Sequence, residues 1–354
     1  MSTNVWAGAS AFVTGHTGFK GGWLSLALSS LGARVSGYAL HPPTDPNLFE
    51  IARVTERLAE STIGDVRDLE AMKNAMRRAE PLVVFHLAAQ PLVRYSYLEP
   101  LETYAVNVIG TANLLEVVRS CPSVKAVVVV TTDKCYHNNE WCWSYREGES
   151  LGGHDPYSSS KACAELVTAA YRSSFLHERD VFVASARAGN VIGGGDWAAD
   201  RLIPDFFRAA DTGRALEIRS PDAVRPWQHV LEPVMGYVSL AEALLGGRAD
   251  CAEAWNFGPQ DEDARPVRWI LDRLASQYQS KPWIGMGSDQ PHEAHVLKLD
   301  SSKAQSKLGW RPRWSLAVAL ERTVEWHQGW LHGKDCQALC LSQFADYRAA
   351  MCGT

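Results

Sequence analysis

The sequence predicts an α/β protein with a doubly wound parallel sheet and a smaller, mixed α/β lobe in its C-terminal half. Short apolar segments alternate with segments of helical periodicity as far as Gly189, and this alternation is typical of parallel strands covered by helices on both faces. After this residue the pattern becomes irregular. We therefore expect a first domain over residues 1–189 and a second lobe over 190–354, with strands of the second half joining the main sheet.

The individual elements follow from local composition. Continuous apolar or β-branched runs predict strands at 10–15, 34–40, 82–88, 126–132 and 181–188. Apolar residues at helical spacing predict helices at 19–31, 68–78, 103–120 and 158–176. In the second half we expect helices at 202–212 and 231–245, short strands at 216–219 and 254–258, and a loop in the glycine-rich segment 189–197.

Bulk composition argues against several classes of protein. The chain has 354 residues, of which 46% are hydrophobic and 21% charged, as in ordinary globular proteins. A net charge of −5 argues against a nucleic-acid partner. The N-terminus lacks a secretory signal pattern, and the longest apolar run, 126–130, is too short to cross a bilayer. The eight cysteines are scattered without a CxxC pair, so we expect reduced thiols and no metal site. Together these features predict a cytoplasmic protein without a membrane partner.

A glycine-rich turn, VTGHTGFKGG, lies at the first junction between a strand and a helix. Gly15, Gly18 and Gly21 form a G-x-x-G-x-x-G pattern, which lets backbone N–H groups approach a pyrophosphate at the positive end of the helix. Many glycine-rich turns bind nothing, but this position favours a Rossmann-type site for NAD. The other expected cofactor-binding residues are His16, Phe19, Asp65, Val66, Ala88, Ala89, Gln90 and Thr131, together with Tyr157 and Lys161.

Two details of this site are unusual. The second strand ends at residues 37–41 without the acid that commonly binds the ribose 2′-hydroxyl, and without an arginine for a 2′-phosphate. NAD remains the expected cofactor rather than NADP, with less support for tight binding. His16, inside the glycine turn, could contact the cofactor phosphates or be a solvated loop residue.

A second motif provides groups for acid–base chemistry. Tyr157 and Lys161 form a Y-x-x-x-K pair one helical turn apart, so both side chains lie on one face. We expect the lysine cation to lower the tyrosine pKa from about 10, giving a phenolate that takes a proton from a sugar hydroxyl. Thr132, Asp133 and Lys134 lie at the carboxyl end of the AVVVVTT strand, where ligands bind in such sheets. A hydroxyl, an acid and a base there suit the elimination of water. The alternatives are that Thr132 only closes the strand and that Asp133 and Lys134 form an exposed ion pair in a turn.

Several longer blocks resemble a known family. VTGHTGFKGGWLSL, TTDKCYHNNEWCWSYRE, GGHDPYSSSKACAELV, RAGNVIGGGDWAADR, RPWQHVLEP and PHEAHVLKLD are similar to segments of the CDP-glucose 4,6-dehydratases, NAD-dependent members of the extended short-chain dehydrogenase/reductase group. The similarity extends from about Val5 to Trp330. One departure is Thr132, where that family commonly has serine, and the exchange keeps the hydroxyl.

The resemblance implies a three-step conversion of CDP-D-glucose to CDP-4-dehydro-6-deoxy-D-glucose. Tyr157, supported by Lys161 and Thr132, removes the proton of the 4-hydroxyl while the C4 hydride goes to NAD. A base, for which Lys134 is the candidate, takes the C5 proton while Asp133 protonates the departing 6-hydroxyl. The hydride then returns to C6 and a proton returns to C5. To act as a base Lys134 must be neutral, which requires a pKa well below about 10.4.

The second lobe is expected to bind the nucleotide sugar. Candidate residues within the resembling blocks are Asn190, Trp197, Arg201, Arg225, Trp227 and Glu293. Arginines suit phosphate oxygens, although most arginines are ordinary surface residues and most tryptophans are partly core. The resemblance also implies a homodimer or homotetramer, paired through the helices at 103–120 and 158–176 with apolar stripes such as Val108, Leu115 and Val118. Packing of these helices on their own sheet is the alternative.

Three other functions stay open. A nucleotide-sugar 4-epimerase would share the cofactor turn, Thr132, Tyr157 and Lys161 but would not need Asp133 and Lys134. A dehydratase could act on another nucleotide hexose, because cytosine is implied by the resemblance alone. A non-catalytic NAD-binding protein would keep the glycine turn without needing the tyrosine.

Overall fold

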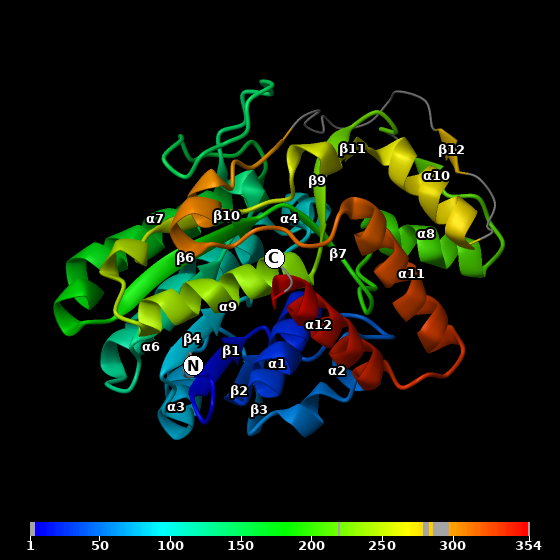
Figure 1. Ribbon diagram of the computed structural model, residues 1–354. Helices are drawn as coiled ribbons and strands as arrows, with labels where there is room; N and C mark the ends of the chain where they lie inside the picture. Colours follow the sequence, from blue (N-terminus) through cyan, green and yellow to red (C-terminus); the bar gives the residue numbers. More distant parts are fainter. Residues whose placement is uncertain (1–3, 219, 279–282, 286–296, 353–354) are drawn as a thin grey trace.

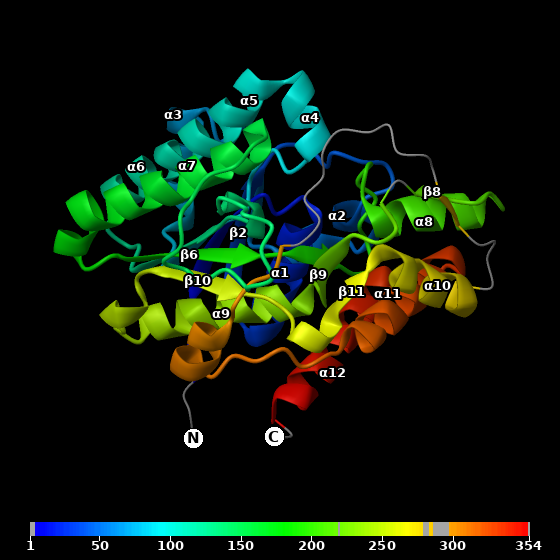
Figure 2. The same ribbon diagram turned by 90° about the horizontal axis from the view of Figure 1, so that it is seen from above.

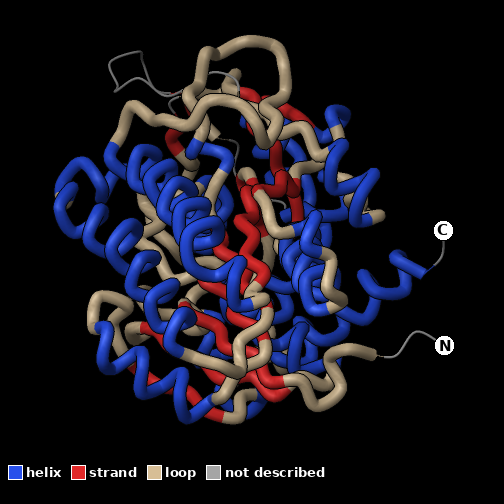
Figure 3. The backbone as a smooth tube through the Cα atoms, turned by 90° about the vertical axis from the view of Figure 1, so that its left-hand side faces the viewer, coloured by secondary structure: helices blue, strands red, loops and turns tan. Residues whose placement is uncertain are grey.

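A seven-stranded parallel sheet forms the centre of the protein, which we describe from a computed structural model covering residues 4–218, 220–278, 283–285 and 297–352. The strands are β1 (Ser10–Thr14), β2 (Arg34–Ala39), β3 (Glu60–Ile63), β4 (Val83–His86), β5 (Ala126–Val130), β6 (Phe182–Ala188) and β10 (Ala254–Phe257). Their order is β10-β6-β5-β4-β1-β2-β3 (Figure 1). Strands lie between two layers of helices, as Figure 3 shows. The predicted fold class is confirmed.

The strands other than β3 are buried along most of their length, and their successive side chains point to opposite faces of the sheet. Phe12 and Val127 belong to one apolar core, whereas their neighbours Val13 and Val128 belong to the other. One core is completed by α1 (Phe19–Leu31), α9 (Leu231–Leu245) and α12 (Cys336–Cys352). The opposite core is completed by α3 (Leu69–Ala79), α6 (Gly110–Ser120) and α7 (Pro156–Tyr171), and Figure 2 shows the two helix layers on either side of the sheet.

Two of the helices expected from periodicity differ in detail. The helix expected at 103–120 begins earlier, as α5 (Pro100–Tyr104), and passes through a π-helical turn, Ala105–Ile109, before α6. The helix expected at 158–176 begins at Pro156, because Asp155 caps its first turn and a proline at the first helical position has a preset φ. Its last turn, Arg172–Leu176, is again π-helical.

The second half of the chain forms a smaller lobe and also completes the main sheet. The lobe contains β7 (Asn190–Ile192), β8 (Glu217–Ile218), β9 (Val224–His229), β11 (Ala264–Pro266), β12 (Ile284–Gly285), α8 (Leu202–Asp211), α10 (Val267–Tyr278) and α11 (Leu316–Leu331). The expectation of a loop throughout 189–197 is wrong, because β7 pairs with β9 in a three-stranded sheet. β10 and α9 belong to the larger part, so both halves of the chain build it. The boundary at residue 190 stays a prediction.

Short helices connect the larger elements. They are α2 (Leu48–Ile51), α4 (Val93–Leu98), the 3-10 helices Val54–Arg57, Asp133–Cys135, His177–Arg179, Ala249–Cys251 and Asp261–Asp263, and the π-helical turn Ala304–Leu308. Within the described residues, no helix has the length and apolar character needed to span a membrane. Among the same residues no cluster of three or more metal-ligating side chains is present, and seven cysteines are free.

Candidate active site

The glycine turn lies at the carboxyl end of β1, between the two strands that extend the sheet in opposite directions, β2 and β4. Doubly wound sheets bind dinucleotides at such a switch in strand order. Gly15 has φ +76°, and a Cβ there would lie 2.7 Å from the backbone nitrogen of Ala88. A Cβ at Gly21 would overlap the carbonyl oxygen of Gly15. Helix α1 begins after Gly18, whose lack of a side chain leaves the backbone N–H groups of the first helical turn without a side-chain cap. These N–H groups and the glycine turn therefore fit a dinucleotide pyrophosphate.

His16 is not a solvated loop residue, and this alternative is wrong. Its ring is buried, its Nε2 lies 2.8 Å from the Ser61 hydroxyl, and it packs edge-on against Phe49. Burial lowers the pKa of His16 to about 4, so the ring is neutral. The ring also leaves no room for a Cβ at Gly37. An imidazole therefore covers the end of β2, where the sequence has no acid.

Two of the other expected cofactor residues, Asp65 and Gln90, have hydrogen-bond or ion-pair partners within the protein. The Asp65 carboxylate pairs with Arg67, with 2.5 Å between Oδ2 and Nη2. Gln90 donates from its side chain to Thr103 (2.9 Å), and its backbone N–H donates to Asn107 (2.9 Å). Of the remaining expected residues, Val66 and Thr131 are buried, and Phe19, Ala88 and Ala89 are half-buried. Contact of these residues with a cofactor stays a prediction.

Tyr157 and Lys161 project from the first two turns of α7, and both side chains are buried. Asp155 fixes the start of the helix, because its carboxylate accepts from the backbone N–H (2.9 Å) and the hydroxyl (2.6 Å) of Ser158. Lys161 Nζ lies 3.3 Å from the carbonyl oxygen of Val130, the last residue of β5. The helix thus brings both side chains to the carboxyl end of the central strands.

The expected lowering of the tyrosine pKa is wrong for the chain on its own. Burial raises the pKa of Tyr157 to about 12, and the hydrogen bond with Thr132 opposes this only in part. Burial, together with the neighbouring cation of Lys20, lowers the pKa of Lys161 to about 7, while Glu165 acts in the opposite direction. Loss of hydration is therefore the largest influence on both groups, and it favours the neutral phenol and the neutral amine. Formation of the phenolate needs a further positive charge near the ring.

Asp133 has the environment of a carboxylic acid rather than of a surface carboxylate. It is 3% exposed, and burial raises its pKa although Lys134, Thr132 and Arg225 act against this rise. Thr132 Oγ1 donates to Asp133 Oδ1 (3.0 Å) and is itself hydrogen-bonded with Tyr157. The two protonatable groups therefore belong to one connected site. Lys134 is half-buried, and its role as the C5 base stays a prediction.

Lys20 is a member of this site that the sequence analysis did not include. It lies in the first turn of α1, yet its charge interacts with Arg201, Asp133 and Asp196, and burial lowers its pKa to about 8. A signal was available, because a cation is unfavourable at the positive end of a helix and needs a reason to be there. Arg201 pairs with Asp196 (2.8 Å) and also interacts electrostatically with Tyr157. The expected residue Arg201 is thus placed beside the reacting groups.

Residues of the second lobe approach the same site through β7 and β9. Asn190 on β7 is in register with Trp227 on β9. Arg225, also on β9, is buried, and its charge reaches Asp133. The indole nitrogen of Trp227 is buried and has no hydrogen-bond partner in the described part of the chain. These positions agree with a sugar nucleotide lying between the lobe and the central strands.

Two other candidates of the second lobe do not gain support. Trp197 packs edge-on against Trp326 and Trp330, with ring centroids 5.7 and 5.1 Å apart. Its ring thus belongs to an aromatic cluster, and its expected place against the sugar or base stays a prediction. Glu293 lies outside the described residues.

Comparison with known proteins identifies relatives along nearly the whole chain. The sequence is 53% identical to the CDP-glucose 4,6-dehydratase of Salmonella typhimurium, over 99% of this chain and 99% of that protein. It is 26% identical to a dTDP-glucose 4,6-dehydratase of Xanthomonas campestris, over 92% of this chain and 95% of that protein. A structure of MoeE5 in complex with UDP-glucose and NAD superposes with a TM-score of 0.78 at 25% identity, covering 91% of this chain and 100% of that chain.

The match to a family covers most of the folded chain. Residues 12–323 match the family described as GDP-mannose 4,6 dehydratase, a span that includes the glycine turn, the Thr132–Asp133 segment and α7. The chain therefore belongs to the GDP-mannose 4,6 dehydratase family.

Proposed function

We propose that the protein is a hydro-lyase that converts CDP-D-glucose to CDP-4-dehydro-6-deoxy-D-glucose, with NAD as its cofactor. The observation that carries the proposal is Asp133, a buried carboxyl with a raised pKa that shares a hydrogen-bonded site with Tyr157. With NAD as hydride acceptor, removal and return of a hydride need only the tyrosine and the lysine from the protein. Departure of a hydroxide from C6 needs an acid, and Asp133 is placed to be one.

The residues of the chain divide the chemistry between two elements. On α7, Tyr157 takes the proton of the sugar 4-hydroxyl, and Thr132 holds the phenolic oxygen in place. NAD, when bound, would supply the hydride acceptor and donor, and its positively charged ring would supply a cation that favours the phenolate. At the end of β5, Asp133 gives its proton to the leaving 6-hydroxyl. Lys134 is the proposed base for the C5 proton, which the ketone at C4 makes acidic.

Recognition of the nucleotide is assigned to the second lobe. Arg201 and Arg225 are the proposed cations for the diphosphate, and Asn190 and Trp227 are the proposed neighbours of the sugar, with Glu293 for the ribose. Support comes from the interaction of both arginines with the reacting groups. The choice of cytosine rests on the relative from Salmonella typhimurium. On this division, residues 1–189 form the cofactor domain and 190–354 the nucleotide-sugar lobe.

The test is incubation of the purified protein and NAD with CDP-, dTDP-, UDP- and GDP-glucose in parallel, read by mass spectrometry. We expect a product lighter by one water, about 18 Da, from CDP-glucose first. An isomer of unchanged mass would mean a 4-epimerase and would contradict the proposal. Faster dehydration of another nucleotide glucose would assign a different substrate to the same reaction. Binding of NAD without turnover of any of the four sugars would overturn the proposal.

A homodimer is the proposed assembly, formed through α5, α6 and α7. Leu115 and Val118 of the expected stripe are buried in the protomer's own core, so for them the alternative of packing on the sheet is right. Other apolar residues of this surface are exposed, with Leu101 at 84% and Leu166 at 60%. Their burial against a second copy would remove apolar area from water. The double variant Leu101→Arg, Leu166→Arg should sediment as a monomer. The control variant Leu40→Arg, at an exposed leucine outside this surface, should keep the sedimenting mass of the wild type. A wild-type protein that sediments as a monomer would overturn the dimer.

We also infer a cytoplasmic location. It fits the seven described cysteines, which are all free thiols; four of them are buried, namely Cys135, Cys251, Cys336 and Cys340. Fractionation of the source cells tests it.

A further inference from the structure

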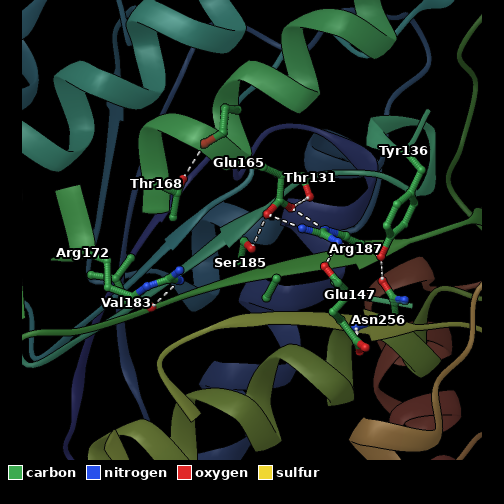
Figure 4. A network of polar contacts seen from close by, with 12 residues as sticks. Thr131, Tyr136, Glu147, Glu165, Thr168, Arg172, Val183, Ser185, Arg187 and Asn256 are labelled. Carbon is green, nitrogen blue, oxygen red and sulfur yellow. Dashed lines mark hydrogen bonds and ion pairs between the residues drawn. The ribbon is translucent and has the colours of Figure 1, made fainter. Parts of the chain in front are cut away.

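A buried ion pair lies next to the proposed reaction centre. Glu165 on α7 and Arg187 on β6 have side chains that are each 3% exposed, and they form two contacts of 2.9 Å, from Nε to Oε1 and from Nη2 to Oε2. The same carboxylate accepts from the hydroxyls of Thr131 (2.5 Å) and Ser185 (2.6 Å). Figure 4 shows the carboxylate between these donors. Both oxygens of Glu165 are therefore engaged.

The guanidinium continues the network in the opposite direction. Arg187 Nη1 donates to the Tyr136 hydroxyl (2.6 Å) and to the backbone oxygen of Glu147 (3.1 Å) (Figure 4). Arg187 Cζ lies 4.8 Å from the centroid of the Tyr136 ring. The Tyr136 hydroxyl in turn donates to Asn256 on β10 (2.8 Å). A continuous chain of hydrogen bonds thus connects α7, β6 and β10.

The network holds both ends of the segment that carries the acid. Thr131 comes directly before the 132–135 segment, and Tyr136 directly after it. Glu165 lies one helical turn beyond Lys161 on the same helix. One ion pair therefore fixes the face of α7 that carries the tyrosine and lysine against both ends of the segment that carries Thr132 and Asp133.

The charge state of the pair agrees with this role. Burial alone would raise the pKa of Glu165, but Arg187 and the two hydroxyl donors hold it below its ordinary value, so the carboxylate is charged. A buried ion pair costs much of its attraction in lost hydration, and well-packed apolar residues often stabilise a fold as well or better. Stability by itself is therefore a weak reason for this pair.

We propose that Glu165 and Arg187 are positioning residues for the elimination of water, which hold the Thr132–Asp133 segment at a fixed distance from the Tyr157–Lys161 face of α7. This inference rests on the proposed function, because it assigns the pair to the acid step. Neither residue has to touch the substrate. Without the link from Thr131 the sugar is still oxidised at C4, but Asp133 no longer meets the leaving hydroxyl in the right geometry.

Two matched variants test the link. Thr131→Val and Ser185→Ala each remove one hydroxyl donor from the Glu165 carboxylate, but only Thr131 belongs to the strand end that leads to Asp133. We expect Thr131→Val to lower kcat about 10-fold and to keep the KM values for NAD and sugar within about 2-fold of the wild type. Enzyme-bound NADH should accumulate during turnover of this variant. Ser185→Ala should stay within about 2-fold of the wild type in kcat. Thr131→Ser, which restores the hydroxyl, should restore kcat.

The charge of Glu165 gives a second readout. It raises the pKa of Lys161. Glu165→Gln should therefore move the alkaline limb of the pH profile of kcat/KM, which reports loss of the Lys161 proton, to lower pH. Arg187→Lys keeps the charge and loses the two-contact geometry, so it should lower kcat without moving this limb.

The outcomes separate the two proposals. A wild-type protein that turns over no nucleotide glucose overturns the function and the positioning role together. A wild-type protein with turnover, but with equal kcat for Thr131→Val and Ser185→Ala, overturns the positioning role alone. The same holds if Thr131→Ser does not rescue, or if Thr131→Val accumulates no NADH.

Discussion

Replacement of Asp133 by asparagine separates the oxidation of the sugar from the loss of water. The amide keeps the size of the side chain and an oxygen for the Thr132 hydroxyl, which now lies 3.0 Å from Oδ1. It has no acidic proton to give. General acid catalysis is worth a factor of about 10² to 10⁴, or about 3 to 5 kcal/mol of barrier, so turnover should fall by that factor.

The initial oxidation should be nearly unchanged in this variant. The charged form of Asp133 raises the pKa of Tyr157, so its removal cannot make the phenol harder to ionise. Mixing Asp133→Asn and NAD with CDP-glucose in a stopped-flow instrument should show NADH forming at close to the wild-type rate and then persisting. Mass spectrometry should show little loss of water on the same timescale.

The control is Asp68→Asn. Asp68 caps α3 by accepting from Ala71 N–H (3.0 Å), outside the site. The amide oxygen can still cap, so this variant should keep wild-type turnover. If Asp133→Asn lost oxidation and dehydration equally, or kept full turnover, Asp133 would not be the acid.

Three further predictions concern groups with shifted pKa values. Tyr157→Phe should lower turnover by more than about 10³-fold and form no NADH, because no phenolate can form; normal NADH formation would remove Tyr157 from its role. Lys20→Met removes a charge that lowers the pKa of Lys161, so the alkaline limb of kcat/KM should move to higher pH, and an unmoved limb would exclude this coupling. Burial raises the pKa of Glu232 from 4.5 to about 7. The folded state keeps this proton to a higher pH than the unfolded state does. The stability that Glu232 contributes is therefore complete below about pH 4.5 and is lost as the pH rises through about 7, which lowers the free energy of unfolding by about 3 kcal/mol. Urea unfolding at pH 5 and pH 8 should show a smaller decrease in Glu232→Gln than in the wild type; equal decreases would contradict the assignment.

The elements that the sequence predicts well are those whose environment is uniform along the chain. β5, with the sequence AVVVV, is buried on both faces, and helices α1 and α9 begin and end where periodicity places them. β3 was not expected, because its sequence ESTI is polar and only half-buried at the edge of the sheet. β7 was missed within a glycine-rich segment, since its pairing partner β9 lies more than 30 residues away in the sequence.

By itself, the sequence determined the chemistry that depends on short spacing. The glycine turn at the end of a strand, and a tyrosine and lysine one helical turn apart, need only local geometry, so their order along the chain was sufficient. The sequence also placed an acid and a hydroxyl directly after β5.

Only the tertiary structure decided how these groups are charged and held. Burial raises the pKa of Tyr157 and lowers that of Lys161, because desolvation depends on which residues pack around a group in the folded chain. The approach of Lys20 to Asp133 joins residues more than 100 positions apart, and the pair of Glu165 and Arg187 joins a helix to a strand. Such contacts form when the layers pack, and no local pattern encodes them.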